Sequence, residues 1–405
     1  MDSNCRQTLQ SGKRKNYRAQ KAKGKSTMSA ITIRPVLTKA DKLDFLKLPF
    51  SIFADDKNWI APLFFERLEH LDENKNPYFK HAAAQLFLAE RNGKPIGRIS
   101  AQIDQLHIDR YNDACGQFGF LDAHDDPEIF SALFAAAENW LRQKGMKKIE
   151  GPFSFSINDE SGLLIEGFGT PPNMMMGHSR PFYEKHVENN GFKKSKDLLA
   201  YLRKLDDALP PDLERRYKWA AKSADLEFRP LNKSQIKSEI QTIMSIFNDA
   251  WKNNWNYVPF TEAELQMLAT NLKLLVHKNS VQIASYKGQS AAFIVAMPNL
   301  NEWFQGLNGR LLPRGLPRLL GKLITKKASS FRIPLMGVRQ EFQDSAIGSA
   351  LSYGLIKKIH EFHAPRGVKE IELSWILEDN ERMKKLIESV GAKVYKTYRV
   401  YQKQL

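Results

Sequence analysis

The sequence predicts a mixed α/β fold made of two tandem copies of one domain. Four short segments recur in the same order in the two halves, an agreement that chance rarely produces. The matching pairs are residues 33–36 with 228–231, 92–94 with 287–289, 145–150 with 367–372, and 191–193 with 391–393. We expect domains at 29–205 and 225–405, joined by a charged linker helix at 206–224.

The local patterns give the elements of each copy in order. Alternating apolar residues on both sides of a short turn predict a β-hairpin, at 86–90 with 96–101 in the first copy and at 281–286 with 291–296 in the second. Apolar residues three and four apart predict helices at 127–144 and 347–362, with Asp126 as a suitable N-cap. The second copy continues with a strand at 369–375, a helix between Asn380 and Gly391, and an aromatic-rich strand at 394–402.

Residues 1–28 form a basic segment before the first copy. Residues 1–27 carry eight Lys and Arg residues against one acid, Asp2, in a chain with a formal net charge of +16. With few large apolar residues, this segment cannot form a core of its own. Two interpretations stay open: a disordered basic tail that contacts anionic lipid or nucleic acid, and translation that starts at Met28.

The bulk composition is that of a cytoplasmic globular protein. The chain has 405 residues, of which 42% are hydrophobic, and it contains no apolar run long enough to span a membrane. Its two cysteines, Cys5 and Cys115, do not make a disulfide framework. His360 and His363 lack a third ligand at usable spacing, so we expect no metal site.

A short turn in the second copy has the character of a phosphate-binding loop. Residues 343–348 read Gln-Asp-Ser-Ala-Ile-Gly and lie between an apolar strand and a helix. Small residues allow a ligand to approach the backbone, and the free N–H groups at a helix start favour negative charge. The turn therefore suits a diphosphate.

This layout resembles the acetyl-CoA-binding half of the GNAT acyltransferases, whose motif reads Arg or Gln, two residues, Gly, one residue, then Gly or Ala. Gln343, Ala346 and Gly348 occupy those positions, with Ala346 replacing the usual first Gly. The resemblance implies that acyl-CoA is a co-substrate. It implies contacts from Met336, Gly337, Val338, Gln343, Asp344, Ser345, Ala346, Ile347, Gly348 and Asn380.

The first copy has three acids, within residues 122–126, where the second has this turn. Three acids repel a diphosphate. We therefore expect only the second copy to hold acyl-CoA, and the first, degenerate copy to shape the acceptor site.

The changing spacing between the matched segments locates one insertion in each copy. The insertion at 303–332 places basic residues every fourth position, opposite a set of leucines: Arg310, Arg314, Arg318, Lys322 and Lys326 against Leu312, Leu316, Leu319, Leu320 and Leu323. A helix is expected from Pro317 to about Lys327. One interpretation is that residues 310–327 lie on the inner face of the inner membrane. The other is a surface helix packed on its own domain.

The other insertion lies between Gly151 and Gly191 and contains Asn158, Asp159 and Glu160 in an apolar loop. These residues suit an acceptor amine, with a carboxylate as base or ammonium anchor. The alternative is that they hydrogen-bond to their own backbone. The catalytic candidates are Glu160, Asn158, Glu378 and Tyr398, with Glu341 and Glu372 as further possible bases. The substrate-binding candidates are Tyr78, Arg98, Asp159 and Trp255.

Residues 31–405 as a whole look like a proteobacterial family of tandem GNAT-like proteins, and bacterial ceramide synthases are similar to this group. Segments that carry the resemblance include 55–62, 76–79, 97–101, 158–162 and 378–380. The resemblance also implies a leaving-group Tyr where Ile387 stands, so that Tyr395, Tyr398 or solvent would replace it.

The function expected is N-acylation of an amine, such as a sphingoid base, by acyl-CoA at the inner membrane surface. The alternatives are a soluble acetyltransferase of a small amine or peptide, and a noncatalytic lipid- or nucleotide-binding protein. No nucleic acid is expected as a partner, since residues 1–27 hold one aromatic, Tyr17, to stack on bases. No obligate protein partner is implied.

Overall fold

The computed structural model describes residues 30–222, 225–313, 315–325 and 327–405. The basic segment 1–28, and any prediction made for it, therefore lies outside the described residues. We call residues 30–205 the first half and residues 225–405 the second half.

The first half contains a hairpin, a crossover helix and a group of short strands. Its elements are β1 (Thr32–Pro35), α2 (Lys39–Ile52), α3 (Phe64–His70), η1 (Pro77–Lys80), β2 (Ala82–Arg91), β3 (Lys94–Asp104), α4 (Gln105–Tyr111), β4 (Cys115–Ala123), α5 (Pro127–Gln143), β5 (Lys148–Gly151), β6 (Phe153–Ser154), β7 (Glu160–Ser161), β8 (Leu163–Glu166), α6 (Tyr183–Asn189) and β9 (Lys193–Lys204).

The second half repeats this plan after α7 (Pro211–Ala221). Its elements are β10 (Leu226–Pro230), η2 (Lys233–Gln235), α8 (Ile236–Trp251), α9 (Glu262–Leu275), η3 (Lys278–Ser280), β11 (Val281–Tyr286), β12 (Gln289–Pro298), α10 (Leu300–Phe304), α11 (Gly315–Thr325), β13 (Ser330–Val338), η4 (Gln340–Phe342), α12 (Ala346–His363), η5 (Ala364–Arg366), β14 (Glu370–Leu377), α13 (Glu381–Ser389) and β15 (Lys393–Gln404).

The predicted hairpins, helices and final strands all form. β2 pairs with β3 and β11 with β12, both antiparallel. Asp126 caps α5 by accepting a hydrogen bond from the backbone N–H of Glu128 at 2.9 Å, as its position before Pro127 predicted. The helix in the second insertion, α11, begins at Gly315, two residues before the predicted Pro317.

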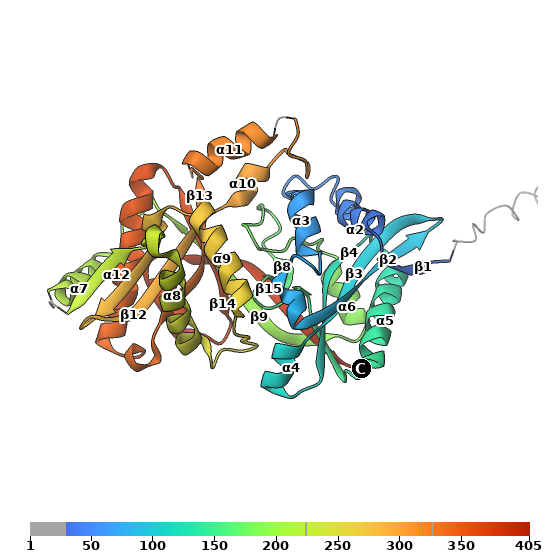
Figure 1. Cartoon of the computed structure of the whole chain (residues 1–405), viewed down its shortest axis with the longest axis horizontal. Coiled ribbons are helices and arrows are strands. Elements are labelled where there is room, and N and C mark those ends of the chain that lie inside the picture. Colours follow the sequence, from blue (N-terminus) through green and yellow to red (C-terminus); the bar gives the residue numbers. More distant parts are fainter. Residues whose placement is uncertain (1–29, 223–224, 314, 326) are drawn as a thin grey trace, which may run out of the picture.

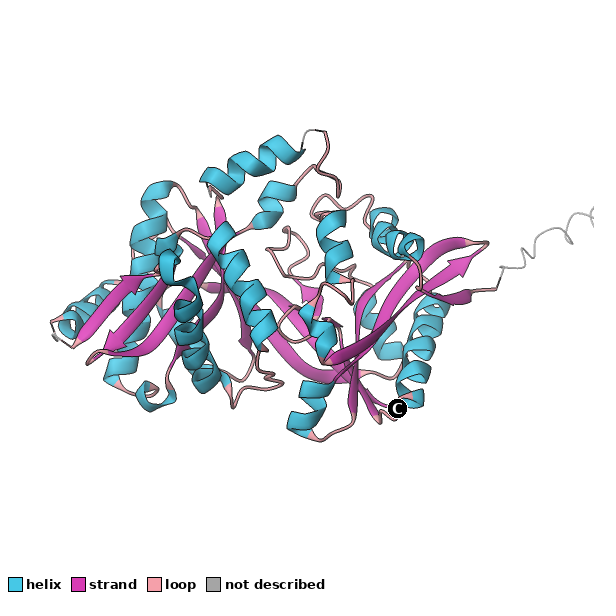
Figure 2. Cartoon of the chain, viewed as in Figure 1, coloured by secondary structure: helices cyan, strands magenta, loops and turns pink. Residues whose placement is uncertain are grey.

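Helices cover both faces of the strands in each half (Figure 2). In the first half, Phe87 and Ala89 pack with α5 on one face, while Leu86 and Leu88 pack with α2 on the other. This follows from the two-residue period of a strand, whose side chains alternate between faces. In the second half α12 and α8 take the corresponding positions.

The two halves exchange their last strands, which the sequence pattern did not predict. The strands form one 13-stranded sheet with the order β1-β2-β3-β4-β5-β15-β9-β14-β13-β12-β11-β10, and β8 also pairs with β15. In Figure 1 the C-terminal strand β15 crosses into the first half, beside β8 and β9. β15 thus completes the first half, and β9 completes the second.

Side chains on the exchanged strands belong to the opposite core. Tyr401 of β15 is fully buried among first-half residues, and its hydroxyl donates to Glu184 at 3.1 Å. Tyr201 of β9 is buried among second-half residues, and its hydroxyl donates to Glu388 at 2.9 Å. The exchange therefore joins the two cores and not only the edges of two sheets.

Candidate active site

A wedge-shaped opening between two parallel strands of the second half leads into a large cavity. β13 and β14 pair from Ser330 opposite Glu370 to Ile333 opposite Leu373. Beyond that point β13 continues to Val338 paired with β12 alone, which leaves its other edge free of ladder hydrogen bonds in the described chain. The cavity has a volume of about 1680 Å³ and is lined by both halves, including Met336, Gly337 and Val338.

The predicted diphosphate turn lies at this cavity. Gln343, Asp344, Ser345, Ala346 and Gly348 line it. The side chain of Ser345 caps α12 by accepting the Gly348 N–H at 3.0 Å, which leaves the N–H groups of residues 346 and 347 at the open end of the helix. The side chain of Ile347 does not reach the cavity and packs against the second-half core.

Gly348 is required by the chain itself. A Cβ at this position would lie 2.0 Å from the carbonyl oxygen of Phe342, far inside van der Waals contact. The close approach of these two backbone segments fixes the angle at which the turn enters α12. Gly348 thus shapes the turn whether or not a ligand is bound.

Arg382 of α13 reaches across the turn and was not predicted from the sequence. Its guanidinium donates to the Gln343 side-chain oxygen at 2.6 Å and forms an ion pair with Asp344. Asn380 also lines the cavity, where its side chain caps α13 by accepting the Met383 N–H at 3.1 Å. The turn therefore has a cation beside it as well as free amides.

The loop of the first insertion forms the opposite wall. Asn158, Asp159 and Glu160 all line the cavity. Asp159 accepts hydrogen bonds from the backbone N–H groups of Phe155 at 3.3 Å and Ser156 at 3.2 Å, so its carboxylate orders the loop. The side chain of Asn158 donates to the Val258 carbonyl of the second half at 3.3 Å.

Glu160 forms an ion pair with Arg67 at the cavity wall. The guanidinium lies 2.7 Å from the Glu160 carboxylate. Burial lowers the pKa of Arg67, but the charge of Glu160 and neighbouring acids raises that pKa more, so Arg67 keeps its proton. Glu160 was predicted from the sequence, but Arg67 was not, because it comes from α3, far away in the sequence.

A buried polar group lies behind the wedge. Arg332 of β13 is 1% exposed and donates to the Met174 carbonyl at 2.9 Å and the Ser374 hydroxyl at 2.9 Å. Its guanidinium lies 3.6 Å from the fully buried carboxylate of Glu372, which accepts hydrogen bonds from Ser374 and Tyr395. Glu372 is thus committed to neighbouring side chains.

Tyr398 lies in the same interior and not at the cavity surface. Its hydroxyl is buried without a hydrogen-bond partner among the described residues. Burial, followed by the nearby carboxylate of Glu372, raises the pKa of Tyr398.

Two further candidates lie outside the large cavity. Glu378 forms an ion pair with Lys194 at 2.5 Å and accepts the backbone N–H of Asp197 at 3.1 Å. Arg98 forms an ion pair with Asp122 at 2.6 Å and lines a separate, smaller cavity. Both side chains are therefore occupied in local contacts.

One face of α12 supplies two cavity residues that were not predicted from the sequence, Ser349 and Tyr353. They line the cavity together with the predicted Ala346, three and seven residues after it on one side of the helix. The Tyr353 hydroxyl lies 2.9 Å from the Ser389 hydroxyl. Ile387, at the position where the motif would have a Tyr, is fully buried in the second-half core. The helical spacing from Ala346 would have found Tyr353.

Much of the remaining wall is apolar. Tyr78 and Trp255 line the cavity, and Tyr78 stacks on Phe155 with ring centroids 5.3 Å apart. Apolar side chains continue from this region to α9 and α10: Phe247, Trp251, Met267, Leu268, Leu272, Leu275, Leu300, Phe304 and Leu335. Such a wall fits a long hydrocarbon chain.

The matching opening in the first half is closed by the chain itself. β4 and β5 pair from Cys115 opposite Lys148 to Gln117 opposite Glu150 and then diverge. The backbone of β6 fills the gap, so that a Cβ at Gly119 would lie 1.8 Å from the Phe153 carbonyl oxygen. The Gln102 side chain holds that carbonyl with a hydrogen bond of 2.7 Å.

The acids that replace the turn in the first half have local partners. Asp122 pairs with Arg98 at 2.6 Å, Asp125 lies 2.7 Å from His186, and Asp126 caps α5. This half of the molecule therefore offers neither an open wedge nor free amides at the corresponding place.

Comparisons with known proteins show which proteins this chain is similar to. No family model matches the chain. The chain is 44% identical to Protein YghO of Escherichia coli (strain K12) over 374 residues, covering 92% of this chain and 95% of that protein. It is 43% identical to a Bacterial ceramide synthase of Caulobacter vibrioides over 381 residues, covering 94% of this chain and 99% of that protein.

Solved structures give the same fold. A tandem GNAT protein from the clavulanic acid biosynthesis pathway matches 93% of this chain and 98% of its own with a TM-score of 0.56 at 12% identity. A GCN5-related N-acetyltransferase from Sphaerobacter thermophilus matches 92% of this chain and 95% of its own with a TM-score of 0.53 at 14% identity. The fold is thus that of the tandem GNAT proteins, as predicted.

The chain has the fold of the GNAT N-acyltransferases. Within that class, the chain belongs to the family that contains YghO and bacterial ceramide synthase. The family resemblance read from the sequence is therefore confirmed.

Proposed function

We propose that this protein is an acyl-CoA-dependent N-acyltransferase that joins a long acyl chain to the amine of a sphingoid base. The observation that carries the proposal is the contrast between the two wedges, one closed by β6 and one open into a largely apolar cavity of about 1680 Å³. A diphosphate turn, a carboxylate and an apolar wall meet in that cavity. The name of the ceramide synthase relative supports the same substrate class.

The donor binds on the second-half side of the cavity in this proposal. The amides at the start of α12 hold the CoA diphosphate, and Arg382 exchanges its contact with Asp344 for a phosphate oxygen. The free edge of β13 at residues 336–338 faces the thioester, where a backbone N–H can polarise the carbonyl.

The acceptor amine binds against the first-half loop. Glu160 anchors the ammonium or takes its proton, directly or through water, and Asn158 positions the amine. The neutral amine nitrogen then forms a bond to the thioester carbon while the carbon–sulfur bond breaks, and the proton that the new amide nitrogen loses passes to solvent. We assign the proton for the departing thiolate to Tyr353, with the buried Tyr398 behind the wedge as the other candidate.

We further propose that the cytoplasmic enzyme works on the inner face of the membrane, held there by α11. Leu312 is 72% exposed and Ile324 is 82% exposed, and Leu316 and Leu320 continue this stripe of apolar side chains. Arg318 is turned back to the Gln305 carbonyl, at 2.9 Å, and Leu319 and Leu323 are half-buried, so α11 also packs on its own half. No helix among the described residues is long and apolar enough to cross a bilayer. The exposed apolar side chains can insert into a lipid surface, and the net positive charge of the chain favours anionic lipids.

The test uses the purified full-length chain with palmitoyl-CoA and sphinganine. We expect release of the free CoA thiol and formation of the N-acylated base. A thiol-reactive reagent measures the first product, and lipid mass spectrometry measures the second. Turnover with acetyl-CoA and a small amine, without turnover of palmitoyl-CoA, would favour the small-substrate alternative. Binding of CoA with no turnover of either thioester would favour a noncatalytic protein.

A further inference from the structure

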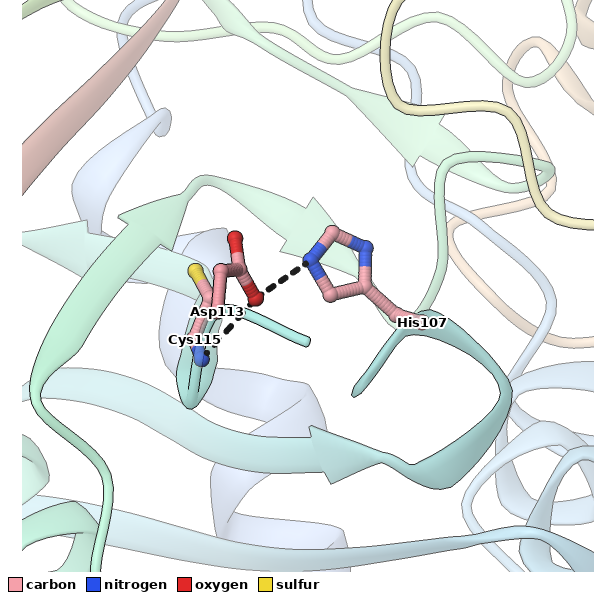
Figure 3. A group of neighbouring side chains, drawn as sticks. All are labelled: His107, Asp113 and Cys115. Atoms are coloured by element: carbon pink, nitrogen blue, oxygen red, sulfur yellow. Dashed lines mark hydrogen bonds and ion pairs between the residues drawn. The ribbon is translucent and has the colours of Figure 1, made fainter. Parts of the chain in front are cut away.

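We propose that His107, Asp113 and Cys115 form a zinc-binding site at the end of α4. Their ligand atoms, an imidazole nitrogen, a carboxylate oxygen and a thiol sulfur, all lie within 4.8 Å of one another. Figure 3 shows the imidazole of His107 directed at Asp113, with Cys115 on the other side of that carboxylate. The site is separate from the cavity and does not depend on the proposed acyltransferase activity.

The state of His107 is the reason to infer a ligand. Its side chain is only 3% exposed, and neither ring nitrogen has a hydrogen-bond partner among the described residues. The Asp113 carboxylate lies 3.5 Å from His107 Nε2, which is too distant for a good hydrogen bond. A buried imidazole without partners is costly, and a bound cation would satisfy one of its nitrogens.

The chemistry of the three groups favours zinc. Thiolate, imidazole and carboxylate together match the ligands that zinc takes in proteins, whereas magnesium and calcium prefer oxygen alone. Ligand atoms around tetrahedral zinc lie about 3.3–3.8 Å apart, given metal–ligand bonds of roughly 2.0–2.3 Å. Small side-chain movements would therefore close the site. Binding replaces the Cys115 thiol proton, which passes to solvent, and leaves water as the fourth ligand beside the partly exposed Asp113.

Zinc at this position would fix the end of α4 to the start of β4. The next residues along α4 contact the second half: Arg110 donates to the Lys252 carbonyl at 2.5 Å, and Tyr111 donates to the Tyr257 carbonyl at 3.1 Å. Tyr257 lines the large cavity. A zinc ion held there would thus support the contact between the halves, although its three ligands do not themselves line the large cavity.

The experiment measures zinc retained by metal-stripped full-length protein after dialysis against zinc chloride. We expect one tightly bound zinc per chain, and cobalt in its place should show the visible bands of a tetrahedral site with a thiolate band in the near ultraviolet. Cys115→Ser should abolish both signals, and His107→Gln and Asp113→Asn should each lose the bound zinc. Cys5→Ser, which removes the other cysteine of the chain, should keep them.

The same measurement can overturn the proposal. It is wrong if the wild-type chain retains no zinc, if Cys115→Ser retains as much as wild type, or if only Cys5→Ser loses the thiolate band. Should Cys115→Ser fail to fold, the bands of His107→Gln and Asp113→Asn decide the question in the same way.

Discussion

Arg382 is the residue whose substitution best tests the donor site, because Gly348 is needed for the turn itself. Replacing Gly348 would force a Cβ against the Phe342 carbonyl, so loss of CoA binding would not distinguish a binding role from a damaged turn. Arg382 is half-exposed and contacts Gln343 and Asp344 through its side chain alone. Its removal leaves the backbone in place.

We predict that Arg382→Ala weakens CoA binding about tenfold with little change in thermal stability. A charge-assisted hydrogen bond contributes about 1.5–3 kcal/mol, and one such bond to a phosphate would be lost. Calorimetric titration with CoA measures the change. Lys384→Ala is the matched control, since Lys384 lies on the same helix, pairs with Glu381 and does not itself line the cavity. Equal affinities in the two variants would contradict the placement of the diphosphate.

Glu160 and Glu378 were both predicted as catalytic carboxylates from the sequence. In the structure Glu160 lines the large cavity and Glu378 does not. We predict that Glu160→Gln lowers kcat about a hundredfold or more while the affinity for CoA is unchanged, since a general base contributes about 10²–10⁴ to the rate. Glu378→Gln should change kcat little, because that carboxylate contacts Lys194 and Asp197 away from the cavity. The reverse order of effects in steady-state assays would move the base to Glu378.

Cavity residues that are contiguous in the sequence could be predicted, whereas those whose partners lie far away in the sequence could not. The turn at 343–348 and the loop at 158–160 are contiguous, and both line the cavity. Arg332, Arg67 and Arg382 act through residues of other elements, so no spacing in the sequence reveals them. Arg98 is a residue that was expected to contact the substrate. In the structure its guanidinium forms an ion pair with Asp122.

At the scale of elements, α11 presents an apolar stripe that can be tested directly. We predict that Leu320→Asp combined with Ile324→Asp lowers binding to phosphatidylglycerol vesicles at least tenfold, because each buried apolar side chain contributes about 1.5–3 kcal/mol. Cosedimentation measures the bound fraction. Leu37→Asp is the control, as Leu37 is 73% exposed and lies in the first half before α2. If the double variant binds as well as this control, α11 is a surface helix and nothing more.

A second feature at this scale is a contact between the halves at His81, the residue that follows η1, and Glu264 of α9. His81 is mostly buried, with its ring nitrogens 2.9 Å from the Asp104 carboxylate and 3.4 Å from the Glu264 carboxylate. Burial lowers the pKa of His81, but the hydrogen bonds to the two carboxylates raise it more, so that the pKa of His81 reaches about 9.

This contact predicts a pH dependence of stability. Because the folded pKa lies above the unfolded value of about 6.5, the stabilisation is fully present below pH 6.5 and is lost as pH rises through 9. The loss amounts to roughly 3 kcal/mol by linkage. We expect the free energy of unfolding of the wild type to fall toward that of His81→Gln across this interval in urea titrations. Parallel curves for the two proteins would show that His81 does not titrate in this way.

At the scale of the whole molecule, the exchange of β9 and β15 makes the two halves one folding unit. Tyr401→Ala should destabilise the protein by about 3 kcal/mol, in the range for large buried side chains, and should do so through the first-half core. Tyr201→Ala is its counterpart, acting through the second-half core. We predict that each variant shifts a single unfolding transition common to both halves.

The prediction of a single unfolding transition can be tested by fluorescence and circular dichroism during guanidinium unfolding, combined with hydrogen exchange of β5 and β12. Two separate transitions, with Tyr401→Ala affecting the second half alone, would mean that each half folds with its own last strand. The sequence could not decide between these arrangements. Both final strands follow the same Gly-x-Lys start, at 191–193 and 391–393, so local propensity gives no preference for one partner over the other.

The position of β15 also sets the order of events during synthesis. Residues 148–151 leave the ribosome long before residues 401–404, their partners in the sheet, so the nascent first half carries an open β5 edge until β15 has been made. β9 likewise waits for β14. Exposed edges of this kind invite pairing with other chains. A nascent chain that stalls just before β15 would therefore leave the edges of β5 and β9 unpaired at once.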